Sequence, residues 1–194
     1  MKDLVPQILA YVSSPFRLFA IVIMAVLTFA GYFIWQNQEV MIGAYSKSQE
    51  LPKMNADKYE SSARLILKNT NALGVVYFSV DPILGKRIVQ SIYLADGSRY
   101  KDYDGHDIGL FSRNKENNRD VIALMAGDMP CNEYKEAQSE IGFWYKSIGT
   151  NYTCRISVPP EQHQFIGQIT VLFKEPVANV ETLLTVASSM LVRK

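Results

Sequence analysis

Residues 18–35 read LFAIVIMAVLTFAGYFIW, and this apolar run predicts the organisation of the whole chain. It contains no charged side chain, and as a helix it would rise about 27 Å, enough to cross the hydrocarbon core of a bilayer. The run ends in the cluster YFIW, as membrane spans commonly do where they meet water. The sequence therefore predicts one transmembrane helix over residues 18–36.

A signal peptide is the main alternative to an uncleaved span. Lys2 and Arg17 precede the run, and residues 28–30 read TFA, which resembles a cleavage site. Against cleavage, the segment before the run is long and already contains apolar residues, and the run continues past Ala30. An uncleaved span is favoured over a signal peptide, and both are favoured over a buried core helix.

The charges that flank the run predict its orientation. Lys2, Arg17 and the terminal amine lie on the N-terminal side, whereas the other side carries Glu39 and no positive charge before Lys47. The positive-inside rule then places the N-terminus in the cytoplasm and the C-terminal domain in the periplasm. The expected parts are a cytoplasmic arm, a span, a linker and a periplasmic globular domain, over residues 1–17, 18–36, 37–54 and 55–194.

The chain has two cysteines, Cys131 and Cys154, and both follow the span. An even number in an exported domain predicts a disulfide, which would close a loop of about 23 residues and stabilise the fold by about 3 kcal/mol. Two unrelated buried thiols are the alternative. No CxxC motif is present, so the sequence does not indicate redox or zinc chemistry.

The charge balance argues against nucleic acid as a partner. Lys and Arg number 20 and Asp and Glu number 19, so no global positive field would attract a polyanion. No basic stripe with interleaved aromatic residues occurs. The roughly 140 residues after the linker have the size of one domain.

The clearest strand signal lies at residues 151–159, where polarity alternates with a period of two. Tyr152, Cys154, Ile156 and Val158 alternate there with Thr153, Arg155 and Ser157. Cys154 is therefore expected on the apolar face of the strand, where a disulfide would be shielded.

Other elements follow from capping, turn and periodicity signals. Helices are expected from Asn55 or Asp57 through Asn69, over residues 121–125, and from about Pro176 to the C-terminus. Strands are expected over residues 73–81, 87–94, 141–148 and 165–173, and residues 100–120 are expected to form a loop. This order predicts an α+β fold, an antiparallel sheet backed by helices like that of PAS-like or NTF2-like sensor domains.

The sequence offers one weak candidate metal site. Asp102, Asp104, His106 and Asp107 resemble the start of a calcium loop, but Arg113 stands where the bidentate glutamate belongs. A solvated loop is the preferred interpretation. No nucleophile elbow or phosphate-binding glycine loop is present, so neither enzymatic activity, nor a metal, nor a cofactor is expected.

Small residues gather on one side of the predicted span. Ala20, Ala25, Thr28 and Gly31 fall within an arc of about 140° on a helical wheel. Small residues let helices approach closely in lipid, so this face is expected to mediate self-association. The alternative is that it reflects only the general abundance of alanine and glycine in spans.

Three features accompany this layout: the cysteine pair, the strand FIGQIT at residues 165–170, and the apolar terminal helix ending in Val192-Arg193-Lys194. Together with these features, the layout resembles the T-family holins of T-even-like and T-five-like phages. The resemblance implies a non-enzymatic protein that accumulates in the host inner membrane. There it would oligomerise into lesions that release an endolysin and time host lysis. It also implies that the periplasmic domain carries a disulfide and binds an antiholin.

Two other classes of function fit the layout. One is a single-span scaffold subunit of a secretion or conjugation system, similar to VirB-eight-like proteins. The other is a periplasmic ligand-sensing domain, which would normally need a second span or an output module.

Overall fold

The computed structural model describes residues 15–38, 53–137, 139–161 and 165–192, and the chain divides into two compact units, residues 1–50 and 51–194. In the first unit the described element is helix α2, Pro15–Gln36. Its 22 residues rise about 33 Å, and none of its side chains is buried. Within the described residues it is the one helix long and apolar enough to span a membrane. The predicted arm and linker lie almost wholly outside the described residues.

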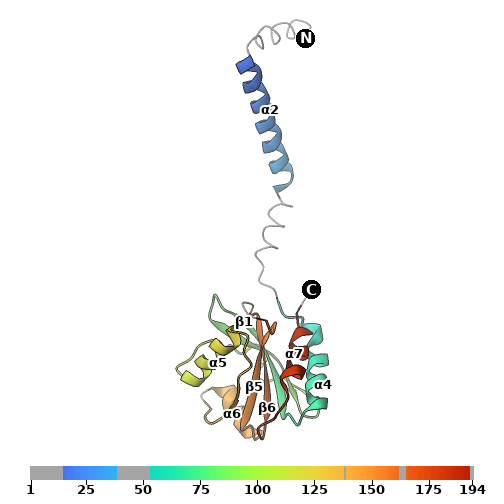
Figure 1. Cartoon of the computed structure of the whole chain (residues 1–194), viewed down its shortest axis with the longest axis vertical. Helices are drawn as coiled ribbons and strands as arrows, with labels where there is room; N and C mark the ends of the chain where they lie inside the picture. Colours follow the sequence, from blue (N-terminus) through green and yellow to red (C-terminus); the bar gives the residue numbers. More distant parts are fainter. Residues whose placement is uncertain (1–14, 39–52, 138, 162–164, 193–194) are drawn as a thin grey trace. The chain divides into compact units, whose positions relative to one another are not determined.

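The second unit is built on a six-stranded antiparallel sheet with the order β3-β2-β1-β6-β5-β4. The strands are β1 (Gly74–Asp81), β2 (Lys86–Leu94), β3 (Arg99–Tyr100), β4 (Cys131–Glu133), β5 (Tyr152–Val158) and β6 (Gly167–Phe173). Figure 1 shows the sheet between two pairs of helices, α4 with α7 and α5 with α6. The predicted α+β fold, an antiparallel sheet backed by helices, is confirmed.

Helices α4 (Tyr59–Asn69) and α7 (Glu181–Ser189) cover one face of the sheet. Asn55 caps the short helix η1 (Ala56–Lys58) by accepting a hydrogen bond from the Asp57 backbone N–H, and α4 follows directly. The predicted helix from Asn55 to Asn69 is therefore confirmed. The main apolar core forms where these helices meet alternate residues of the central strands. It includes Ala63, Ile66, Val75, Tyr77, Ile156, Ile169, Val171, Leu184 and Ala187.

The terminal helix begins later than predicted. The sequence placed its first turn at Pro176, but α7 begins at Glu181. Asn179 adopts a positive φ of 59°, which a right-handed helix does not accommodate, so the helix starts only after it. The terminal segment is apolar, as predicted, and its residues Leu184, Ala187 and Leu191 are all fully buried.

The prediction of a strand at residues 141–148 was wrong. Glu140–Ser147 form helix α6, which Ser139 caps by accepting a hydrogen bond from the Gly142 backbone N–H at 3.2 Å. Ile141 and Tyr145 lie one helical turn apart and are buried against the sheet. The apolar and aromatic run has the composition of a strand, but its buried positions follow a helical period.

The prediction of a loop over residues 100–120 and a helix over 121–125 was only partly right. Helix α5 spans Lys115–Met125, because the Asn114 side chain accepts hydrogen bonds from two backbone N–H groups of the first turn. The short strands β3 and β4 were not predicted. Each forms by pairing with a longer neighbour in the sheet, and a stretch of two or three residues carries no periodicity of its own.

Candidate functional site

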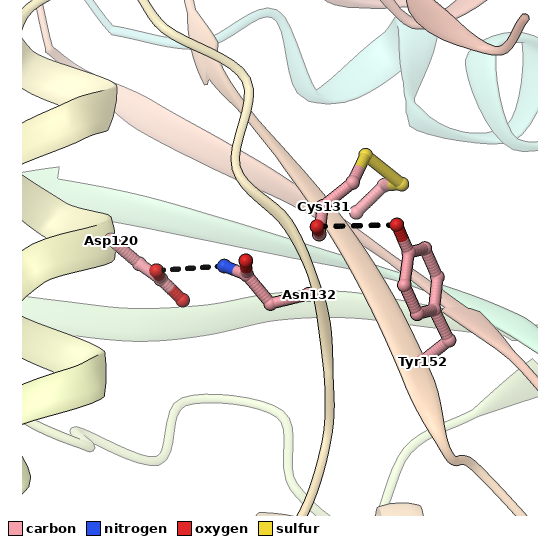
Figure 2. The surroundings of a disulfide bond; sticks show 5 residues. Asp120, Cys131, Asn132 and Tyr152 are labelled. Atoms are coloured by element: carbon pink, nitrogen blue, oxygen red, sulfur yellow. Dashed lines mark hydrogen bonds between the residues drawn. A yellow bond between two sulfur atoms is a disulfide. The ribbon is translucent and has the colours of Figure 1, made fainter. Parts of the chain in front are cut away.

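The two cysteines lie at the β4 edge of the sheet. Cys131 on β4 pairs with Cys154 on β5 in the antiparallel register, and the two sulfur atoms are bonded. Cys154 is fully buried on the face covered by α4 and α7. Figure 2 shows the disulfide and the Tyr152 hydroxyl, which donates a hydrogen bond to the Cys131 carbonyl oxygen at 3.2 Å.

The residue after Cys131 points to the opposite face. The Asn132 side-chain N–H donates to Asp120 Oδ1 at 3.0 Å, and Asp120 belongs to helix α5 (Figure 2). Strand β4 is therefore held covalently on one side of the sheet and by a hydrogen bond to α5 on the other, because successive side chains of a strand alternate between faces.

The face beneath α5 and α6 is partly polar, although it is buried. The residues of β5 and β6 that alternate with the apolar core are Thr153, Arg155, Ser157, Gln168 and Thr170. Four of these five are buried, and Arg155 is nearly so, with 12% of its side chain exposed. All of them except Ser157 line one side of a cavity of about 680 Å³ between the sheet, α5, β4 and the start of α6.

An ion pair connects α5 to the floor of this cavity. The Arg155 guanidinium donates to Asp120 Oδ2, and only 7% of the Asp120 side chain is exposed. Arg119 Nη2 lies 3.8 Å from the other carboxylate oxygen. Burial raises the pKa of Asp120, and the two arginines act in the opposite direction. The carboxylate of Asp120 is thus already shared by two arginines and Asn132.

Arg87 on β2 also lines the cavity, and it is more deeply buried than Arg155, with a relative exposure of 6%. Its Nη1 donates to Gln168 Oε1 at 3.1 Å and its Nη2 donates to Asn117 Oδ1 at 2.8 Å, so both acceptors are neutral amides. Its Nε has no hydrogen-bond partner within the described part of the chain. Burial, with a smaller effect of Arg155, lowers the pKa of Arg87 to about 10.

The buried part of the cavity therefore combines two guanidinium groups with one carboxylate, and the rest of its lining carries charges of both signs, on Arg113, Glu116, Arg119, Glu133, Lys135 and Glu136. Apolar surface from Phe78 and Tyr145 completes the inner wall. Among the described residues, no three His, Cys, Asp or Glu side chains lie close enough to hold a metal ion. The excess of one positive charge among the cavity's buried groups favours an anion as a ligand.

The acidic segment at residues 102–107 is used for local structure. Asp104 pairs with Arg99 at 2.7 Å, and Asp107 Oδ1 accepts a hydrogen bond from the Gly109 backbone N–H at 2.9 Å. His106 packs its ring edge-on against Tyr103. The side chains are thus engaged in turns and pairs at the surface, in line with the preferred interpretation as a solvated loop.

The predicted packing face of the span lies on α2. Ala20, Ala25, Thr28 and Gly31 are all exposed in the first unit. The Thr28 hydroxyl donates to the Met24 carbonyl oxygen at 2.8 Å, so its polar group is satisfied within the helix. These residues and the disulfide belong to different units, and neither lines the cavity.

The sequence reasoning missed the cavity residues Arg87, Asp120, Asn132, Arg155 and Gln168. One signal was present: Gln168 and Thr170 interrupt an otherwise apolar strand, and Thr153, Arg155 and Ser157 share the matching face of β5. In an antiparallel sheet such an alternation usually separates a buried face from a solvated one. Only the packing of α5 over those residues reveals that both faces are buried.

The protein is an α+β domain on a six-stranded antiparallel sheet, preceded by an apolar helix. The sequence matches no protein-family model and no curated protein. Similar solved structures include the GAF domain region of a protein from Geobacter sulfurreducens PCA, with 15% identity, a TM-score of 0.49, and coverage of 70% of this chain and 89% of that one.

Two further similar structures come from photoreceptors. A far-red cyanobacteriochrome photoreceptor has 10% identity and a TM-score of 0.49, and the match covers 80% of this chain and 92% of that one. The phycocyanobilin-bound GAF domain of a cyanobacterial phytochrome has 13% identity and a TM-score of 0.43, covering 78% of this chain and 85% of that one. All three TM-scores lie below 0.5, so none of these similarities defines a family or a function for this chain.

Proposed function

We propose that this protein is a phage holin: it inserts α2 into the host inner membrane, oligomerises there into lesions that release an endolysin, and thereby times host lysis. The observation that carries the proposal is the exposed apolar surface of α2. None of its 22 residues is buried by the described protein, including Phe19, Leu27, Phe33 and Trp35. Such a surface is stable only if lipid or another copy of the helix removes it from water.

The small-residue face of α2 supports the oligomerisation step. In lipid, helices associate through close van der Waals packing rather than through a hydrophobic driving force. Ala20, Ala25, Thr28 and Gly31 offer a surface with short side chains. Because the Thr28 hydroxyl is satisfied within its own helix, the face presents no unpaired donor to the hydrocarbon region.

The globular unit supports a periplasmic location for the larger part of the chain. A disulfide persists in an oxidising compartment, and Cys131 and Cys154 are bonded. On the proposed topology this domain binds an antiholin, and the N-terminus faces the cytoplasm. The proposed function is non-enzymatic.

The proposal is tested by inducing the full-length protein in a bacterial host together with a soluble endolysin. We expect growth to continue for a time and then respiration to stop abruptly, with loss of membrane potential and release of the endolysin. A reporter that works only in the periplasm should be active when it is fused after Lys194. A reporter that works only in the cytoplasm should be silent at the same position. The matched control is residues 53–194 exported without α2, which should leave the membrane intact.

Two results would contradict the proposal. Accumulation in the inner membrane without depolarisation or endolysin release would favour a scaffold subunit of a secretion or conjugation system. Recovery of a mature protein that lacks α2 would instead assign residues 18–35 to a signal peptide.

A further inference from the structure

We propose that the cavity between α5, β4, α6 and the sheet is a binding site for a small organic monoanion, a carboxylate with an apolar body. The central observation is Arg87, a buried guanidinium whose hydrogen-bond acceptors are both neutral. This site is independent of the proposed holin function, because it uses no residue of α2.

Arg87 is unusual because a buried charge normally has a partner of opposite charge. Burying an ion without a counter-ion is costly, and natural proteins compensate with pairing. No carboxylate of the described residues lies within salt-bridge distance of Arg87. Its Nε–H is buried and unpaired within the same residues, and the Arg87 side chain lines the cavity.

The charges of the inner wall indicate one negative charge on the ligand. Arg155 is paired with Asp120, and Asp120 also accepts from Asn132, so its carboxylate is occupied. Of the two buried guanidinium groups, that of Arg87 has no carboxylate within salt-bridge distance among the described residues. A carboxylate suits it, since a guanidinium presents planar N–H donors that match the two carboxylate oxygens.

The size and the remaining walls indicate the rest of the ligand. A volume of about 680 Å³ lies within the range of small-molecule sites, which is about 300–1,000 Å³. Phe78, Ile141 and Tyr145 provide apolar and aromatic surface on the same wall. A ligand with an aromatic or aliphatic body beside its carboxylate would use both kinds of surface.

The experiment measures thermal unfolding of the full-length protein in lipid nanodiscs at neutral pH, with increasing benzoate as the probe. Benzamide is the neutral control of the same shape, and sodium chloride at the same ionic strength is the control for salt. We expect a saturable rise in the unfolding temperature with benzoate alone. Arg87→Gln should weaken the apparent benzoate affinity about tenfold to a hundredfold, since it removes charge-assisted hydrogen bonds.

Two further variants keep the test decisive if Arg87→Gln does not fold. Gln168→Glu places a carboxylate where Oε1 already lies 3.1 Å from Arg87 Nη1, so it should supply the counter-ion internally. That variant should be more stable than the natural protein and should no longer respond to benzoate. Arg64→Gln is the matched control, because Arg64 is an exposed arginine on α4 whose partner is Glu60.

Several outcomes would overturn the proposal. They are a response to benzamide as large as that to benzoate, an unchanged benzoate response in Gln168→Glu, and no saturable response to benzoate at all. None of these outcomes bears on membrane permeabilisation, so this proposal and the holin proposal can fail separately.

Discussion

A single buried hydroxyl joins three elements of the globular unit. Ser62 on α4 is fully buried, and its hydroxyl accepts a hydrogen bond from the Tyr77 phenol at 3.0 Å. The same hydroxyl donates to the carbonyl oxygen of Ala187 on α7 at 3.1 Å. Ser62 therefore connects the two helices to each other and to β1 through directional bonds inside an apolar core.

We expect Ser62→Ala to lower the free energy of unfolding by about 1–3 kcal/mol, because it leaves the buried Tyr77 hydroxyl without an acceptor. Adding Tyr77→Phe to this variant should cost little more or should restore stability, since the orphaned group is then removed. Urea unfolding followed by circular dichroism measures both. Ser61→Ala, at the exposed neighbouring position, is the control and should change stability by less than about 0.5 kcal/mol. Equal effects of the two alanine variants would contradict this account.

At the scale of the element, the small-residue face of α2 leads to a specific prediction about packing between helices. A Cβ atom added at Gly31 meets no atom within 4 Å, so a larger side chain fits the isolated helix without strain. Any effect of enlarging this residue must therefore come from contacts between helices.

We expect Gly31→Leu to preserve membrane insertion and to delay or abolish the onset of lysis, because leucine keeps the helix apolar while it separates packed copies. Chemical crosslinking in membranes should show fewer oligomers, and lysis curves give the delay. Val26→Leu is the control, since Val26 lies on the opposite side of the helical wheel. The face has no role in association if the two variants lyse on the same schedule.

The elements also show what sequence patterns can and cannot predict. The strand over residues 151–159 was predicted because its alternation is local. Helix α6 was mistaken for a strand because aromatic and β-branched residues are common in its apolar run, although Ser139 supplied a capping signal. Strand β4 could not be predicted, since three residues pair with β5 only in the folded chain. The cavity was missed for the same reason, because its polar wall is buried by the distant helix α5.

At the scale of the whole molecule, the buried tyrosines make stability depend on alkaline pH. Burial raises the pKa of Tyr59 to about 12, and it raises the pKa of Tyr77 and Tyr145 still further. In an unfolded chain a tyrosine has a pKa of about 10. Above that pH the unfolded chain loses protons that the folded protein keeps, so the unfolded state is favoured.

We expect full stability below about pH 9 and a progressive loss as the pH rises from 10 towards 12, by up to about 1.4 kcal/mol per pH unit for each buried tyrosine. Urea unfolding of the full-length protein in detergent between pH 8 and 11 measures the slope. Tyr145→Phe should make the slope shallower, because phenylalanine does not titrate. A flat profile up to pH 11 would show that these phenols reach solvent in the folded state.

The two faces of β4 have a consequence for how the protein matures. Cys131 is fixed to β5, and the next residue, Asn132, holds the Asp120 carboxylate that occupies Arg155. Without the covalent bond, β4 would be held only by its three register pairs with β5 and by hydrogen bonds such as that from Asn132 to Asp120. On the proposed topology, oxidation follows export, so newly made chains would complete the cavity wall only after crossing the membrane.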